Sequence, residues 1–286
     1  MTYIDLHCHS TFSDGTLTPE ELIDKARELK LSHLAITDHD TISGLDSAYA
    51  YASNFSDIEI ISGIEITVTM PKSPFEGHEF HMLGLGFDIS HPALLSAMEF
   101  MKEARNDRNH RTIKALQEEG VDITYSEVEA LAPDGVLTRT HLARLMLEKG
   151  YVATLDEAFK GYFQGNAKTN LPKNSLLPRE AIEIIHSAGG VAILAHPMRY
   201  GLSHHMITQL VMSLSRAGID AIEAIYYSHS LEDERFLRGL ALSEKLLISG
   251  GSDYHGKNRN VELGIGYGEL RIGLDIWEKL KRRVKC

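Results

Sequence analysis

Histidine and carboxylate residues recur in this sequence at the ends of short apolar runs. His7 and His9 end the first such run, and Asp253 and His255 follow another, with one residue between the members of each pair. Residues i and i+2 of a strand point the same way, so each pair can present two ligands to one ion. Imidazole and carboxylate groups bind divalent cations and transfer protons. The two pairs therefore predict metal-assisted chemistry.

Five further residues of this kind lie at or near predicted strands: Asp14, His39, Glu65, His81 and His196. In a parallel barrel the carboxyl ends of the strands meet on one face, where active sites form. A single His-x-His, or a lone His before Pro, is commonly an ordinary surface or turn residue. Recurrence at several separate strand ends favours one metal site instead. The set holds no thiolate, which argues against a structural cysteine-rich zinc site.

Neighbouring residues have other interpretations. Cys8 lies between two predicted ligands, so its side chain should point the opposite way, into packing. His78 follows a glycine in a predicted turn, and His81 inside the next strand is the preferred ligand. Asp38 and Asp40 are predicted to orient ligand imidazoles, although Asp40 could equally cap the helix that follows.

The elements that must position these residues alternate strands and helices. Strands are expected at 3–8, 33–37, 58–61, 64–69, 80–87, 191–195, 220–225 and 246–249. Thr18, Pro19 and Glu21 form the start signal of a helix, with a cap, a first-turn proline and a glutamate three residues after the cap. Further helices are expected at 43–52, 92–119, 126–131, 140–149, 155–162, 178–187, 204–217, 231–244 and 274–283. The alternation favours a parallel sheet, either a barrel or an open doubly wound sheet.

The alternation is interrupted once. No strand is expected between about residues 92 and 170, where helical segments follow one another. We therefore expect an α/β barrel in two parts, residues 1–91 and 171–286, with an all-helical insertion at 92–170 that could cover the substrate.

Bulk composition limits the classes of function. The chain has 286 residues, of which 43% are apolar, but no run of about 20 apolar residues that would span a membrane. It has two cysteines and no secretory signal, so a cytoplasmic location is expected. A net charge of −11 argues against binding of long nucleic acid but allows a small anion in a locally positive pocket. The oligomeric state stays open.

Six short motifs occur in a fixed order: His-x-His at 7–9, SDG at 13–15, TDHD at 37–40, GIE at 63–65, AHP at 195–197 and SDYH at 252–255. As an ordered set, they resemble the polymerase and histidinol phosphatase (PHP) family. The resemblance implies a distorted seven-stranded (β/α) barrel and three divalent ions, with Mn²⁺ the first expectation and Fe²⁺ or Zn²⁺ the alternatives.

The resemblance also implies roles for individual residues. The ligands would be His7, His9, Asp14, His39, Glu65, His81, His196, Asp253 and His255. Glu65 would bridge two ions. One ion would lie among His7, His9, Glu65 and Asp253, the second would be completed by His81 and His196, and the third would be held by Asp14, His39 and His255. The residues expected to act in catalysis are Asp14, His39, Glu65, His196 and His255.

The helical insertion points to a subgroup. An insertion after FHMLGLGF at 80–87, together with TRTHLAR at 138–144 and HPMRY at 196–200, resembles PHP members that remove the 3′-phosphate from nucleoside 3′,5′-bisphosphates. Some of these relatives also trim short 5′-phosphorylated RNA. Guanidinium groups bind phosphate bidentately. The residues expected to bind substrate are Arg139, His141, Arg144, Lys173 and Arg199.

The charges of the ligand set support phosphate chemistry. Three carboxylates, six neutral imidazoles and three divalent ions would leave the site at about +3, which suits a phosphate dianion. Our hypothesis is that a metal-bridging hydroxide attacks phosphorus. Three alternatives stay open: a histidinol-phosphate or other small-molecule phosphatase on the same fold, a C–N hydrolase, and a non-catalytic PHP module. The C–N hydrolases often use a mid-barrel lysine where this chain has Glu65, and degenerate modules lose ligands.

Overall fold

The computed structural model describes residues 2–133, 135–165, 167–172 and 174–284. Within them, seven strands form one sheet in chain order: β1(Tyr3–Cys8), β2(Leu31–Ile36), β3(Glu59–Thr69), β4(Glu79–Leu85), β5(Val191–Leu194), β6(Ala221–Tyr226) and β7(Leu247–Gly251). The segment after β7 returns to β1, where the Asp253 N–H donates to His7 O at 2.8 Å and the His9 N–H donates to Tyr254 O at 2.9 Å. The sheet thus forms a nearly closed barrel, which confirms the predicted fold class.

The expectation of an entirely parallel sheet is wrong at β4. Strands β1 to β3 are parallel to one another, as are β5 to β7, but β4 is antiparallel to both of its neighbours. The reason is the short connection at 70–78, because a parallel crossover needs a dozen or more residues, commonly with a helix. The reversal places the beginning of β4 beside the end of β3, with His81 opposite Thr67.

The two strands expected at 58–61 and 64–69 are one continuous strand, β3. The Ser62-Gly63 pair suggested a break. Instead, Gly63 lies against β2, where an added Cβ would be 2.5 Å from the Ile36 carbonyl oxygen. The glycine therefore permits a close approach of two strands and does not end either of them.

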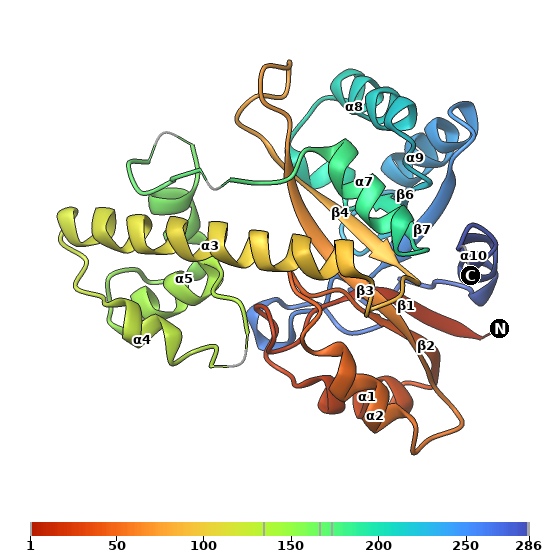
Figure 1. The fold of residues 1–286 in the computed structure, drawn as a ribbon, viewed down its shortest axis with the longest axis horizontal. Helices are drawn as coiled ribbons and strands as arrows, with labels where there is room; N and C mark the ends of the chain where they lie inside the picture. Colours follow the sequence, from red (N-terminus) through yellow and green to blue (C-terminus); the bar gives the residue numbers. More distant parts are fainter. Residues whose placement is uncertain (1, 134, 166, 173, 285–286) are drawn as a thin grey trace.

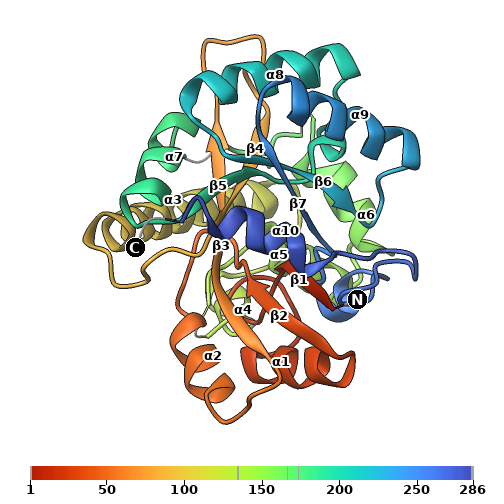
Figure 2. The same ribbon diagram turned by 90° about the vertical axis from the view of Figure 1, so that its right-hand side faces the viewer.

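The barrel helices are α1(Pro19–Glu28), α2(Leu45–Ala52), α7(Pro178–Ser187), α8(His204–Ala217), α9(Leu231–Ser243) and α10(Leu274–Lys281), with single 3₁₀ turns η2(Pro197–Tyr200) and η3(Gly256–Asn258). The predicted start of α1 is confirmed, since Thr18 and Glu21 exchange the two hydrogen bonds of a capping box. One apolar cluster joins the strands to α1, α2, α7, α8 and α9. A second joins them to α10, which lies across one end of the barrel (Figure 2).

The inserted helices are α3(Pro92–Glu118), α4(Tyr125–Glu129), α5(Arg139–Glu148) and α6(Leu155–Ala158), followed by a π-helical turn, η1(Phe159–Phe163). Figure 1 shows α3 running from the barrel into this helical group. Its first half contributes Leu94, Ala97 and Met101 to the barrel core, and its second half contributes Ile113 and Leu116 to a separate helical core. We propose the predicted bounds 92–170 for this insertion. No helix among the described residues is long and apolar enough to cross a membrane.

Closure of the barrel depends on the absence of a side chain at Gly251, because an added Cβ would be 2.1 Å from the His7 Cβ. We expect Gly251→Ala to lower the free energy of unfolding by about 1–3 kcal/mol, since β7 must move away from β1. Gly239→Ala is the control, because its Cβ would meet nothing within 4 Å in α9. It should raise stability by about 0.5–1 kcal/mol. Chemical denaturation measures both, and equal stability of the two variants would contradict the argument.

Candidate metal centre and phosphate pocket

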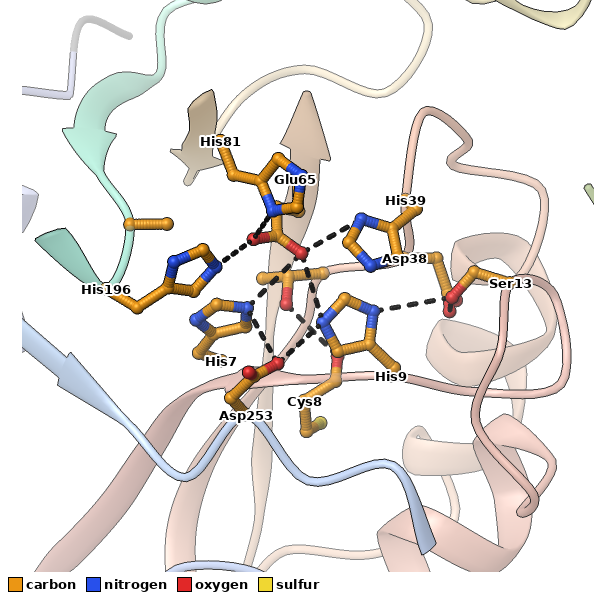
Figure 3. Close-up of polar contacts among 12 residues, drawn as sticks. His7, Cys8, His9, Ser13, Asp38, His39, Glu65, His81, His196 and Asp253 are labelled. Carbon is orange, nitrogen blue, oxygen red and sulfur yellow. Dashed lines mark hydrogen bonds and ion pairs between the residues drawn. The ribbon is translucent and has the colours of Figure 1, made fainter. Parts of the chain in front are cut away.

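All nine predicted ligands lie at one end of the barrel, beside the insertion. They come from the end of β1, the loop that follows it, the turn after β2, the middle of β3, the start of β4 and the segments after β5 and β7. Figure 3 shows His7, His9, His39, His81, His196 and Asp253 around the Glu65 carboxylate, with the Cys8 side chain directed away from the centre. Cys8 is buried and its thiol donates to Ala35 O at 3.3 Å, which confirms its packing role.

Glu65 is the centre of this arrangement. It is fully buried, and its two oxygens face imidazole nitrogens of five histidines. Its Oε2 lies 3.0 Å from His39 Nδ1, 3.2 Å from His9 Nε2 and 3.5 Å from His7 Nε2. Its Oε1 lies 2.9 Å from His81 Nδ1 and 2.8 Å from His196 Nε2. His78, the rejected alternative to His81, instead stacks on Phe80.

Three groups of donor atoms could each hold a metal ion, with all atoms of a group within 4.8 Å of one another: His7, His9, Glu65 and Asp253; His9, Asp14, His39 and His255; and His39, Glu65 and His81. The first group is the one that the family resemblance implied. The second adds His9 to the implied set. The third has His39 where the resemblance implied His196, which nevertheless contacts the same Glu65 oxygen as His81.

Metal-ligating atoms that are buried without a hydrogen-bond partner indicate whether cations fit this site. Six side-chain atoms of the predicted ligands are buried and make no hydrogen bond among the described residues: His7 Nε2, His9 Nε2, Asp14 Oδ1, Glu65 Oε2, His196 Nδ1 and His255 Nε2. An unsatisfied buried polar group is costly, and a buried charge more so. Divalent ions prefer this mixture of imidazole and carboxylate donors. The side chains therefore fit divalent cations.

The carboxylates at the centre are held ionised. Burial opposes ionisation of Glu65, but the charges of His81, His39 and His7 outweigh it and hold its pKa well below the usual range. For Asp14, the charges of His255 and His39 likewise outweigh burial and hold the pKa well below its usual range. These anions create a strongly negative centre that requires cations.

The imidazoles divide into two kinds. For His9, burial is outweighed by Asp253 and Glu65, which raise its pKa to about 9. In the metal-free chain, a proton therefore supplies the positive charge that the carboxylates require. Burial lowers the pKa of His196 to about 3, so this imidazole is neutral and ready to bind an ion.

Glu223 on β6 is a functional residue that sequence reasoning missed. It is fully buried, its Oε1 lies 3.0 Å from His7 Nδ1, and its Oε2 accepts from the His196 N–H at 2.7 Å. A carboxylate behind a ligand histidine fixes its orientation and raises its basicity. The signal was present, because a glutamate inside the apolar run 221–225 must be buried and must have a partner.

Asp38 and Asp40 act less directly than predicted. Asp38 accepts from Ser13 Oγ at 2.5 Å, and that hydroxyl lies 3.4 Å from His9 Nδ1, so Asp38 orients a ligand through a serine. Asp40 accepts from the Thr67 N–H at 2.7 Å and pairs with Arg105 of α3. The alternative that Asp40 caps the next helix is wrong, since the cap position of α2 is Gly44 and has no side-chain bond.

Three turns at the site have backbone conformations that are rare for residues other than glycine. Asp40, His196 and Asp253 have φ values of 54°, 26° and 49°. Each such residue costs on the order of 1–3 kcal/mol, and such residues cluster at functional sites. Each follows a strand and begins the turn that aims a side chain at the centre or at the insertion.

Asp253 has two further partners that the sequence did not reveal. Arg259 pairs with its Oδ2, and the same oxygen accepts from Tyr226 OH at 2.6 Å. Burial is outweighed by the charges of Arg259 and His7, so the pKa of Asp253 lies well below its usual range. Arg259 follows the SDYH motif at an irregular spacing, which offered no sequence signal.

The insertion supplies the opposite wall of the site. A cavity of about 180 Å³ has residues of both parts in its lining. They include Asp14, His39, His81 and Arg259 from the barrel and Arg105, Arg108, Thr138, Arg139, Thr140 and Phe159 from the insertion. Thr140 Oγ1 donates to Asp14 Oδ2 at 2.7 Å, so the insertion contacts a predicted ligand directly.

Two of the predicted substrate-binding residues line a continuous space. Arg139 donates to both carboxylate oxygens of Glu79, at 3.1 and 3.3 Å, and lines both the cavity and an adjoining groove of about 800 Å³. Arg199 donates to Tyr227 OH at 2.7 Å and lines the same groove. The described residues that line the groove include none of the nine predicted ligands.

The other three predicted residues are placed differently. His141 is buried and accepts from the Thr138 N–H at 3.0 Å, so it caps α5, and burial lowers its pKa to about 4. Arg144 is partly exposed and is not among the described residues that line the cavity or the groove. Lys173 lies outside the described residues.

A family model for the PHP domain matches residues 5–191. The chain belongs to the PHP family. A 5′-3′ exoribonuclease of Haemophilus influenzae is 36% identical over 96% of this chain and 98% of its own length. A 3′,5′-nucleoside bisphosphate phosphatase of Chromobacterium violaceum is 32% identical over 99% of this chain and 98% of its own.

The fold of this PHP protein has a solved counterpart. A Bifidobacterium adolescentis protein, assigned provisionally as a metal-dependent phosphoesterase, superposes with a TM-score of 0.87 at 29% identity, over 100% of this chain and 97% of that one. The chain is a metal-dependent phosphoesterase, as the sequence predicted.

Glu223 gives a test of ligand orientation. We expect Glu223→Gln to weaken metal binding by about 10- to 100-fold, because the amide keeps the shape of the side chain but loses the charge that supports His7. Titration of metal-free protein with Mn²⁺, followed by calorimetry, measures the affinity. Glu232→Gln, at an exposed position of α9, should bind like the wild type. Unchanged affinity in the Glu223 variant would show that His7 does not depend on this carboxylate.

Proposed function

We propose that this phosphoesterase removes the 3′-phosphate from nucleoside 3′,5′-bisphosphates and trims short 5′-phosphorylated RNA. The observation that carries the proposal is the cavity in which Arg105, Arg108, Arg139 and Arg259 face predicted ligands of the metal centre. Guanidinium groups recognise phosphate through paired donors. The names of the two full-length relatives agree with both substrates.

We propose three divalent ions, with Mn²⁺ the first choice. The three donor groups described above would hold them, with Glu65 shared by two of the groups. Cations bound there would supply the charge that activates water and stabilises negative phosphate oxygens. Fe²⁺ and Zn²⁺ accept the same donors and are the alternatives.

The chain's own residues bind and orient the substrate. Arg139 uses two N–H donors on Glu79, and a guanidinium has five, so three stay available to a phosphate. The Glu79 contact fixes the guanidinium plane before substrate arrives, which reduces the entropy lost on binding. The groove beyond Arg139 would receive the nucleoside. A histidinol-phosphate or other small-molecule phosphatase remains the alternative, but it would leave most of that groove without a ligand.

A panel of substrates tests the proposal. Phosphate release with Mn²⁺ should be fastest for adenosine 3′,5′-bisphosphate, measurable as nucleotide release for short 5′-phosphorylated RNA, and slowest for histidinol phosphate. His9→Ala is the blank, since it removes a donor shared by two metal groups, and should lose turnover and bound metal while it stays folded. A preference for histidinol phosphate would overturn the substrate assignment. Full activity of His9→Ala would overturn the site.

Arg139 tests the role of the insertion. We expect Arg139→Ala to raise KM by about 10-fold or more for adenosine 3′,5′-bisphosphate, because charge-assisted hydrogen bonds contribute about 1.5–3 kcal/mol each. A small aryl phosphate should be affected less, since it does not reach the groove. Steady-state kinetics on both substrates give the comparison. Equal effects would remove Arg139 from nucleotide recognition.

A further inference from the structure

Arg108 is a buried arginine with a hydrogen-bond donor that has no partner among the described residues. It lies on α3, is 3% exposed, and belongs to the lining of the cavity beside the predicted ligands. Its Nη2 donates to Asn109 Oδ1 at 3.1 Å, and its Nε has no hydrogen-bond partner among the described residues. The nearby carboxylates of Asp40 and Glu79 act on its guanidinium but are paired with Arg105 and Arg139.

Its neighbours make this position unfavourable for a cation. Arg105, one helical turn earlier on the same face of α3, is paired with Asp40, and Arg139 is paired with Glu79. Burial and the charges of these two arginines outweigh the carboxylates of Glu79 and Asp40, and lower the pKa of Arg108 to about 9. The side chain is therefore cationic at neutral pH in surroundings that oppose its charge. A buried charge that its surroundings oppose is costly, so an anion that binds there gains a ready partner.

The opposite wall of the cavity has its own requirement for an anion. Asp14, His39 and His81 line it, and with divalent ions bound that wall becomes positive. The two proposed substrates share one chemical feature, because each carries a 5′-phosphate on the same nucleotide whose 3′-phosphate group is attacked. A substrate with two phosphates can satisfy both walls, whereas a monophosphate leaves one of them unpaired.

We propose that Arg108 receives the phosphate group that is not hydrolysed, and that it thereby selects nucleotides with a 5′-phosphate over simple monophosphates. This inference rests on the proposed function and adds a specificity-determining residue to it. Arg105 and Arg139 flank Arg108 and contribute their remaining donors. The bidentate geometry of a guanidinium suits a terminal phosphate, which has three exposed oxygens.

The kinetic test compares adenosine 3′,5′-bisphosphate with adenosine 3′-monophosphate on the Mn²⁺-loaded enzyme. We expect Arg108→Met to lose about 10- to 100-fold more in kcat/KM on the bisphosphate than on the monophosphate, because charge-assisted hydrogen bonds to the 5′-phosphate disappear. Lys114→Met is the matched control, since Lys114 is an exposed cation on the same helix. It should match the wild type on both substrates. An equal loss on the two substrates in Arg108→Met would overturn the proposal.

Thermal unfolding separates a binding role from a structural one. Without ligand, Arg108→Met should melt at the same temperature as the wild type or higher, because it removes a buried charge that its surroundings oppose. Adenosine 5′-monophosphate should raise the melting temperature of the wild type and of Lys114→Met but not that of Arg108→Met. A variant that melts lower and keeps the full ligand shift would show that Arg108 is structural. Arg108→Gln repeats both measurements if the methionine variant does not fold.

The kinetic and thermal measurements together distinguish a failure of the proposed function from a failure of the proposed role of Arg108. A wild type that binds adenosine 5′-monophosphate through Arg108 but does not hydrolyse the bisphosphate would overturn the proposed function and keep the phosphate receptor. A wild type that hydrolyses the bisphosphate, with no dependence on Arg108 in either readout, would overturn the receptor alone.

Discussion

The structure depends on a concentration of negative charge that the barrel places out of contact with water. Glu65 is fully buried, and Asp14 and Asp253 lie close to it with the pKa of each held well below its usual range. Such a group of anions is tolerable only where cations neutralise it. In the metal-free chain the raised pKa of His9 shows a proton in that role. Divalent ions would replace the proton, so folding, protonation and metal binding share one electrostatic origin.

The reversed strand is what completes this centre. A hairpin between β3 and β4 places His81 on the strand next to Glu65, and a parallel crossover would have required a helix at that place. The turns after β2, β5 and β7 then bring in the remaining side chains with backbone conformations that a free chain would avoid. The close packing of the barrel, seen at Gly251 and Gly63, holds those turns in place.

The sequence predicted the residues of the centre but not what supports them. The ligand types and the i, i+2 spacing of His7 and His9 follow from local geometry, which is why they could be read from the chain. Glu223 acts through His7, which is distant in sequence, and periodicity contains no information on such pairs. The antiparallel direction of β4 could have been predicted, because the connection at residues 70–78 is too short for a parallel crossover. The burial of Arg108 could also have been predicted in part, because Arg105, Arg108 and Thr112 occupy the helical spacing at which α3 buries its side chains.

The insertion and the metal centre are physically connected. Arg105 of α3 pairs with Asp40, the residue after His39, and Thr140 of α5 donates to Asp14. A displacement of the helical group would therefore disturb two ligand-bearing turns and not merely uncover the site. The same helices bring arginines to an otherwise acidic chain at the point where phosphate must bind. The acidic barrel end requires cations, and the arginines that the insertion places in the cavity favour an anion, so a phosphorylated substrate between them neutralises what neither group can neutralise alone.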